Sequence, residues 1–431
     1  MLRFATTGGR TMMILIVLAG SLALTATGLV NSDVVRLPAN IIEVQSAQAA
    51  ETASASWQFS YGNVQVKLEE AKAILANKEI YAGRTIYKCT EYRNLDPNRV
   101  TPSRMDFDDR DRQIAAALLN PVTGELAYIS IVRMACGVSA PAGYAIEIVS
   151  QDNGVTWNAW STMYRIMRDG QEWSVILVNY PVARGSGKSM TIEPFLYSPY
   201  SDSWASGQEF MNGGGEYLVS VDEAARASLR KNAVMSLAVP GVPVADVIPQ
   251  SFVLHRPLLE QSDLAMAIWN PEATAGRVLG ILSLNHEKAF TQTVSTAAAY
   301  GMYQFTDKKV NGTYTTVKKN YPKAGLIKDF KEGAKDHVNS AKAMILLDDL
   351  NLRTLVKTFG PQIIQDPKLG EYLAAAYNGG ITRVVRALRA KTWPKGDWAL
   401  AMSGKGYKET QGFIAKLRVF QEAKLFGSIL D

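Results

Sequence analysis

Residues 281–290 read ILSLNHEKAF, and this stretch decides what the second half of the chain can be. Apolar residues before it, such as Val278 and Leu279, predict a buried helix that ends close to Glu287. A carboxyl group at the end of an apolar helix can have its pKa raised by desolvation, and it can then protonate a leaving oxygen. A single glutamate at a helix end is more often a solvated surface residue, so this stretch alone assigns no function.

Two later stretches follow it. Residues 294–305 read VSTAAAYGMYQF, where small side chains and Gly301 allow close backbone approach. Met302 and Gln304 add an apolar wall and an amide that can bond to a sugar. Residues 372–388 read YLAAAYNGGITRVVRAL, which predicts one helix capped at its YNGG sequence and a second helix after it. Each stretch alone could equally be a packed turn or an ordinary helical hairpin.

Together the three stretches resemble the Slt-type (family 1) lytic transglycosylases, a branch of the lysozyme-like superfamily. In that family a Glu, usually followed by Ser, ends a helix. The patterns S-x-x-G-A-x-G-L-M-Q, A-Y-N-A-G and E-T-x-x-Y-V then follow. The matching residues here are Glu287, Ser295, Ala299, Gly301, Gln304, Ala376, Tyr377, Asn378, Gly380, Glu409 and Thr410. The resemblance covers roughly residues 252–420.

The sequence departs from the family pattern at several positions. Lys288 stands where the family has Ser, Ala298 where it has Gly, and Met302-Tyr303 where it has Leu-Met. Lys288 matters most, because a cation beside Glu287 would lower the pKa of that acid unless the ammonium points to solvent.

The resemblance implies a peptidoglycan lytic transglycosylase, a glycan lyase that cleaves the β-1,4 bond between N-acetylmuramic acid and N-acetylglucosamine. Glu287 would be the single acid and base, and Tyr377 would hold it by a hydrogen bond. Glu287 would protonate the leaving oxygen while the N-acetyl group of the muramic acid stabilises the positive centre. It would then deprotonate the C6 hydroxyl of the same sugar, which closes a 1,6-anhydro ring.

The same resemblance implies a set of substrate-binding residues and no cofactor. The substrate-binding residues would be Ser295, Gly301, Met302, Gln304, Asn378 and Glu409. The three histidines of the chain show no metal-ligand spacing, so we expect no metal site. Two other functions stay open: a hydrolytic muramidase that admits water, and a cell-envelope binding or scaffold protein with an inactive lysozyme-like domain.

The N-terminus predicts export. Arg3 and Arg10 precede an uncharged stretch whose apolar centre, residues 12–30, is long enough to anchor the chain in the inner membrane. A cleaved signal peptide is the alternative, with a small-residue site at Ala47-Gln48-Ala49. Either way we expect the body of the protein in the periplasm or cell envelope.

Charge and cysteines add to this picture. The net charge of +6 suits an approach to anionic glycan strands or a membrane surface, and no basic cluster indicates nucleic acid. In an exported protein, Cys89 and Cys136 suggest one disulfide, with two buried thiols as the alternative.

We therefore expect an α+β multidomain protein. The predicted parts are a signal anchor or signal peptide (1–32), a linker (33–56), a β-rich domain (57–219), a connector (220–251) and a mostly α-helical lysozyme-like domain (252–431).

Finer features of the middle of the chain are also predicted. Residues 64–78 show a helical pattern, and Gly213–Gly215 indicate a break before a short helix from Val221 to Asn232. The β-rich domain offers a surface for an envelope protein partner. A glycan-binding role for it would need an exposed tryptophan among Trp157, Trp160 and Trp173.

Overall fold

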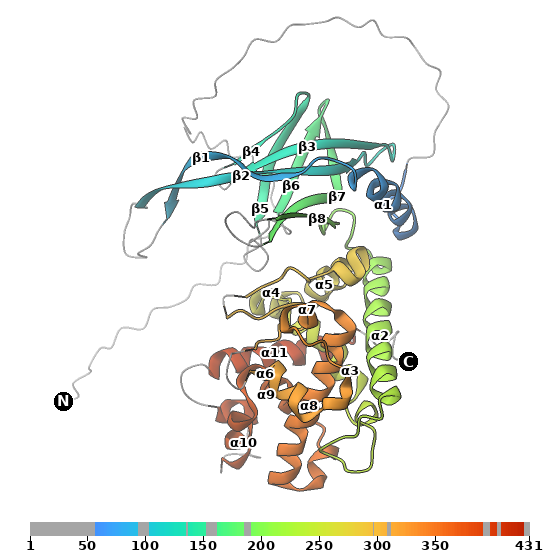
Figure 1. The fold of residues 1–431 in the computed structure, drawn as a ribbon, viewed down its shortest axis with the longest axis vertical. Coiled ribbons are helices and arrows are strands. Elements are labelled where there is room, and N and C mark those ends of the chain that lie inside the picture. The colour runs from blue at the N-terminus through green and yellow to red at the C-terminus, as the bar shows by residue number, and fades with distance from the viewer. Residues whose placement is uncertain are drawn as a thin grey trace, which may run out of the picture. The chain divides into compact units, whose positions relative to one another are not determined.

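The chain forms an antiparallel β region followed by a mostly helical region (Figure 1), so the expected α+β class is confirmed. The computed structural model describes residues 57–93, 103–134, 137–151, 162–184, 191–295, 297–307, 312–390, 397–402 and 407–425. All of them belong to one compact unit, Ala55–Asp431.

Eight strands make one sheet in the β region. They are β1 (Tyr81–Arg93), β2 (Ser103–Leu119), β3 (Leu126–Met134), β4 (Gly137–Ser139), β5 (Tyr144–Gln151), β6 (Thr162–Arg168), β7 (Gln171–Arg184) and β8 (Thr191–Tyr197). The main path runs β4-β3-β2-β7-β6-β5, with β1 paired to β2 and β8 paired to β7. Every pairing is antiparallel.

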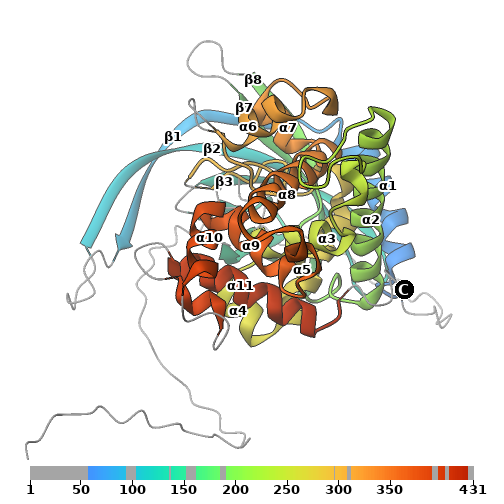
Figure 2. The same ribbon diagram turned by 90° about the horizontal axis from the view of Figure 1, so that it is seen from below.

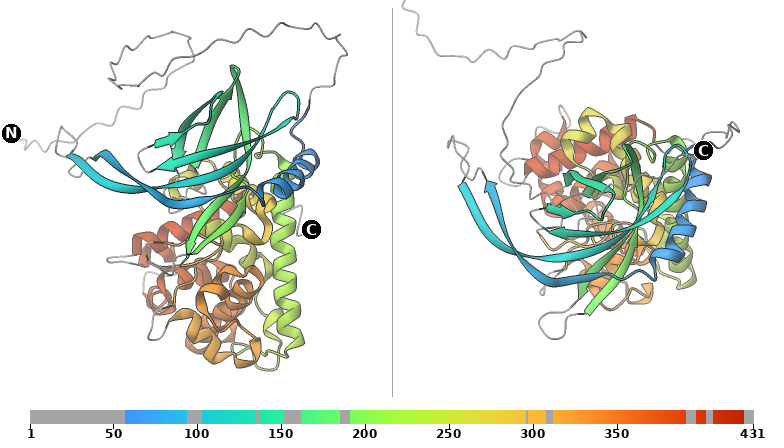
Figure 3. Two further views of the ribbon diagram at one scale, coloured as in Figure 1. Left: turned by 45° about the horizontal axis from the view of Figure 1, so that its top comes forward. Right: turned by 90° about the horizontal axis from the view of Figure 1, so that it is seen from above.

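Strand β2 holds the sheet together, because β1, β3 and β7 all pair with it. Its C-terminal half is buried on both faces, since Ala116 and Leu118 join one core cluster and Ala115 and Ala117 another. Its N-terminal half pairs with β1 as a curved two-stranded ribbon, which Figure 3 shows extending past the other strands.

Helix α1 (Tyr61–Leu75) covers one face of this sheet and confirms the helix predicted from the sequence. Its buried apolar residues recur at three- and four-residue spacing, which places them on one stripe: Val64, Leu68, Ala71 and Leu75. This stripe packs into a core with residues of β2 and β7, namely Ala115, Ala117, Leu119, Ile176 and Leu177.

Helix α2 (Gln208–Lys231) corrects the prediction of a break followed by a short helix. Gly213–Gly215 lie inside this continuous helix, whereas the sequence suggested that the chain turns there. Figure 1 shows α2 as the long green helix that runs along the helical region.

The glycines of α2 serve contact with α5 (Pro271–Asn285), not a turn. A Cβ at Gly214 would lie 2.0 Å from the carbonyl oxygen of Leu279. The two helix backbones therefore approach closely only because this position has no side chain. The close packing between the helices offsets the poor helix propensity of glycine.

The helical region continues with further helices after α2. They are α3 (Gln250–Glu260), α4 (Leu264–Trp269), α5, α6 (Thr313–Asn320), α7 (Phe330–Lys335), α8 (His337–Phe359), α9 (Leu369–Gly379), α10 (Ile381–Arg389) and α11 (Tyr407–Glu422). Short 3-10 turns lie in the connections between these helices, at Val244–Asp246, His286–Lys288, Pro322–Ala324, Pro361–Gln365 and Trp398–Ala401. Figure 2 shows α9, α10 and α11 gathered beside one another.

The stretch between α2 and α3 is tightly packed. The Asp349 carboxylate on α8 accepts a hydrogen bond from the backbone N–H of Leu237 at 2.7 Å and bonds to the hydroxyls of Ser236 and Tyr321 at 2.5 Å each. A buried carboxylate with three donors is fully satisfied, so it fixes this stretch against α8.

Several expectations fall outside the described residues. They are the anchor, the linker, Cys136, Trp157 and Trp160, and nothing is described of the Cys89 side chain, so the disulfide stays a prediction. Trp173 is only 5% exposed, which removes it as a platform for sugars. Within the described ranges, no helix has the length and apolar character needed to cross a membrane.

Candidate functional site

Glu287 lies on a short turn at the end of a buried helix. Helix α5 is buried over almost its whole surface, and it ends at Asn285 with a 3-10 turn, His286–Lys288, directly after it. His286 has a φ of 45°, an uncommon conformation for a residue with a side chain. The Glu287 side chain is exposed, and it makes no hydrogen bond or ion pair with the described part of the chain.

The residue that ends α5 is bonded to the β region. The Asn285 Oδ1 accepts the backbone N–H of Ser198 at 2.7 Å, and its Nδ2 donates to the Ser198 carbonyl at 2.9 Å. Both residues are buried, and Ser198 directly follows β8. Because the amide side chain is paired on both its atoms, the start of the Glu287 turn has one defined position.

The other side of the turn is bonded to helices α2 and α8. The ring of His337 lies 2.8 Å from the Ala289 carbonyl through Nε2 and 2.8 Å from the Tyr217 hydroxyl through Nδ1. A carbonyl only accepts, so Nε2 carries the proton, and burial lowers the pKa of His337, which favours the neutral ring. The Tyr217 hydroxyl therefore donates to Nδ1.

The charge of Glu287 acts on Tyr217 and on His286. Burial raises the pKa of Tyr217, and the next contribution is the negative charge of Glu287. Burial lowers the pKa of His286, and the charge of Glu287 partly opposes that effect. The sequence suggested an acid desolvated by apolar neighbours, whereas the structure shows an exposed carboxylate beside Tyr217 and two histidines.

The stretch 294–305 folds back on itself. Tyr300 forms antiparallel bridges with both Val294 and Phe305. The Ser295 hydroxyl accepts the backbone N–H of Ala299 at 3.0 Å, so it stabilises the turn between Val294 and Tyr300.

Three predicted site residues of this stretch have structural contacts. Gly301 has a φ of 75°, and a Cβ there would lie 2.0 Å from the Ala334 carbonyl oxygen. Met302 is 0% exposed and packs in the core. The Gln304 amide donates to the Gly301 carbonyl at 2.7 Å, so its side chain closes the same turn.

Tyr377 bonds to this stretch. Its hydroxyl donates to the Tyr303 carbonyl, its ring meets Phe305 edge-on at 5.8 Å, and the Arg256 guanidinium lies 4.7 Å from the ring centre. A phenol has one proton, so the hydrogen bond that the resemblance assigned from Tyr377 to Glu287 is not formed here. The 294–305 and 372–388 stretches are nevertheless in direct contact.

Asn378 and the late Glu-Thr pair also meet. The Thr410 hydroxyl donates to Asn378 Oδ1 at 2.8 Å, which joins the end of α9 to the first turn of α11. Glu409 is exposed beside it. The end of α9 therefore contacts two segments that are distant in sequence. Tyr377 bonds to residues 294–305, and Asn378 bonds to the turn that carries Glu409.

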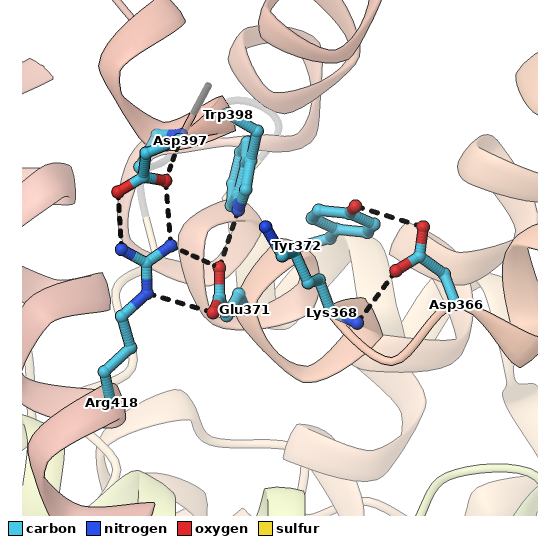
Figure 4. A network of polar contacts seen from close by, with 8 residues as sticks. Asp366, Lys368, Glu371, Tyr372, Asp397, Trp398 and Arg418 are labelled. Carbon is cyan, nitrogen blue, oxygen red and sulfur yellow. Dashed lines mark hydrogen bonds and ion pairs between the residues drawn. The ribbon is translucent and has the colours of Figure 1, made fainter. Parts of the chain in front are cut away.

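Arg418 fixes the relative position of these two helices (Figure 4). From α11, its guanidinium donates to both oxygens of Glu371 on α9, at 3.0 and 2.7 Å, and to both oxygens of Asp397, at 2.6 and 2.9 Å. The Trp398 ring N–H adds a bond to Glu371 at 2.6 Å. Bidentate pairing gives direction as well as energy, so the helices that carry Tyr377 and Glu409 are held in register.

The structure adds one acid that the sequence analysis missed. Glu260 ends α3, is half-buried, and burial raises its pKa to about 7 despite the charges of Arg256 and Lys416. After burial, the negative charge of Glu260 is the largest cause of the raised pKa of Tyr377. The sequence context of Glu260, LLEQSD, shows only an ordinary helix end, because apart from Arg256 on the same helix the charges that act on it, Lys416 and Glu409, come from α11.

A hollow of about 530 Å³ lies elsewhere, between α2, the first turn of α5 and the end of α11. None of the residues predicted for the site lines it. No group of three His, Cys, Asp or Glu side chains among the described residues is arranged to hold a metal ion, and the expectation of a metal-free site stays a prediction.

Comparison of the chain with known protein families, with characterised proteins and with solved structures finds no match.

Proposed function

We propose that this protein is a peptidoglycan lytic transglycosylase, with a lysozyme-like helical region and Glu287 as the acid and base that cleaves the glycan. The observation that carries the proposal is the position of Glu287. An exposed carboxylate without a counter-ion in the described chain stands on a turn that is bonded on one side to Ser198 and on the other to His337. Such a rigid turn suits a group that must meet one bond of a substrate.

Contacts among the motif segments support the same function. Residues 294–305 follow the Glu287 turn directly, Tyr377 bonds to Tyr303, and Asn378 bonds to Thr410. Segments that resemble one family in order along the chain thus also meet in space.

The proposal assigns different tasks to the predicted residues. Ser295, Gly301, Met302 and Gln304 shape the segment beside the turn, and Tyr377 holds that segment in place. Glu409 and the amide nitrogen of Asn378, whose oxygen already accepts from Thr410, would contact the glycan. Because Glu287 is exposed, the bound glycan must exclude water from its carboxyl group and so favour the protonated form that acts as the acid.

The test is digestion of purified peptidoglycan by the full chain, with mass analysis of the released fragments. We expect 1,6-anhydro ends from the wild type and a loss of at least about 100-fold in rate for Glu287→Gln, the contribution of general acid catalysis alone. Glu272→Gln is the matched control, because Glu272 is also an exposed carboxylate on α5 but at its opposite end, and it should retain full activity.

The products decide between related functions. Reducing ends in place of anhydro ends would identify a hydrolytic muramidase. Equal activity of Glu287→Gln and the wild type would remove Glu287 from the mechanism. Absence of any product from the wild type, with binding to peptidoglycan retained, would indicate an envelope binding protein.

A further inference from the structure

Glu260 has the surroundings of a functional acid, not of a surface carboxylate. It ends α3 where this helix meets α9 and α11. Its carboxylate makes no hydrogen bond or ion pair within the described chain, although Arg256 lies one helical turn before it. An acid that is half-buried and unpaired costs free energy when ionised, so ionised Glu260 does not stabilise the fold.

Arg256 supplies a second, independent observation. It is 1% exposed, and only its Nη2 is paired, with Asp348 at 3.3 Å. Its Nε and Nη1 have no hydrogen-bond partner among the residues that the structure describes, and its guanidinium lies over the ring of Tyr377. Buried guanidinium donors without acceptors are rare in a finished core, so this group is incomplete as the structure stands.

Among the described residues, the charged groups that act on Glu260 are Arg256 on its own helix and Lys416 and Glu409 on α11. Glu260 in turn acts on Tyr377 of α9, and Asp348 of α8 pairs with Arg256.

These neighbours oppose one another. Burial and the charge of Glu409 favour the protonated acid, whereas Arg256 and Lys416 favour the carboxylate. Lys416 does not neutralise Glu260 directly, because its ammonium donates to the carbonyls of Leu259 and Ser262.

We propose that Glu260 is a glycan-binding residue of the same site, which binds in its protonated form by donating a hydrogen bond to a sugar oxygen. The location supports this role, because α3 contacts α9 and α11, the helices that carry Asn378 and Glu409, which the proposed function assigns to the glycan. Ionisation of Glu260 removes the donor and adds a negative charge, so glycan binding weakens as the pH rises through neutrality. This inference rests on the proposed function.

The experiment measures binding of the full chain to purified peptidoglycan sacculi at about pH 5.5 and about pH 8.5, which bracket a group that titrates near neutral pH. Glu287→Gln is the background, so that the sacculi are not digested. We expect this variant to bind about threefold to tenfold more weakly at the higher pH, the value of one hydrogen bond.

The decisive variant adds Glu260→Gln. A glutamine stays neutral and keeps a donor at both pH values, so binding should match the low-pH value throughout. The matched control adds Glu272→Gln instead and should keep the pH dependence. Both variants meet the same sacculi, so titration of the cell wall itself cancels in the comparison.

The outcomes separate the two proposals. Binding that is independent of pH in the background variant, or a pH dependence that survives Glu260→Gln, overturns the role of Glu260 and leaves the glycan function standing. Failure of the background variant to bind sacculi at either pH overturns the glycan function, and the role of Glu260 falls with it.

Discussion

Asn285 and Ser198 exchange two hydrogen bonds, and through them the end of α5 is joined to the end of β8. Asn285 lies two residues before Glu287, and both partners are buried. The β region thus acts on the Glu287 turn directly, which is a structural task separate from the partner surface that the sequence suggested.

Asn285→Ala should lower both stability and activity. The substitution leaves the backbone N–H of Ser198 buried without an acceptor, which costs about 1–3 kcal/mol of unfolding free energy. Chemical unfolding measures this loss, and glycan release should fall further than stability explains because Glu287 loses its position. Asn320→Ala is the control. Both Asn285 and Asn320 donate to the carbonyl four residues before them, but Asn320 is exposed, so its loss should change little. Equal effects of the two substitutions would contradict this account.

Gly214→Ala should destabilise the protein strongly. The added methyl group would meet the Leu279 carbonyl, which is backbone of α5 and cannot move aside without moving the helix. We expect a loss of at least about 2 kcal/mol in unfolding free energy. Gly62→Ala is the control, because a Cβ at this position of α1 meets nothing within 4 Å and alanine is the better helix former. A Gly214 variant as stable as the wild type would contradict the close crossing of α2 and α5.

Glu260→Gln should stabilise the protein at alkaline pH. The folded-state pKa of about 7 exceeds the ordinary value of 4.5, so the folded state binds the proton more tightly than the unfolded state. Wild-type stability should therefore fall as the pH rises from about 4.5 to about 7, and the glutamine variant should lack this fall. Thermal unfolding at pH 8 should show a melting temperature at least about 2 °C higher in the variant. Parallel stability curves for the two proteins would show that Glu260 does not titrate near neutral pH.

Asp397→Asn should have the opposite pH dependence. Hydrogen bonds from Arg418 lower the pKa of Asp397 to about 2 from the ordinary value of 3.8. The ionised pair therefore contributes its full stability above about pH 4 and loses it as the pH falls towards 2. Urea unfolding should show the wild type more stable than the variant at neutral pH, with a gap that closes over this interval. Glu422→Gln is the control, because Glu422 is an exposed carboxylate at the end of α11, the helix that carries Arg418. Its difference in stability from the wild type should stay constant over this interval.

The sequence predicts the features that depend on local pattern. The apolar repeat of α1, the strand texture before residue 200 and the buried helix before Glu287 are all periodic, so they could be recognised without the fold. Gly213–Gly215 misled the prediction, because a glycine triplet has the same local signature whether it turns the chain or lets two helices touch. Only the position of Leu279 distinguishes the two cases.

The site is less accessible to sequence reasoning than the fold. The resemblance implied a hydrogen bond from Tyr377 to Glu287, whereas in the structure Tyr377 donates to the Tyr303 carbonyl, within residues 294–305. The sequence did not indicate that the proton of Tyr377 is used by a carbonyl, because backbone partners leave no trace in the sequence. The environment of Glu260 arises from residues up to 156 positions away in the chain, such as Lys416, so no local signal could have identified it.

The crossing of α2 and α5 also bears on how this fold could change during evolution. A boundary drawn at residue 252 would remove both α2 and Ser198, the partner of Asn285. It would also expose the flank of α5 that α2 covers. The helical region is therefore not a transferable module. A recombination event that moved it to another protein would have to carry the preceding strands as well, so the two halves should be inherited together.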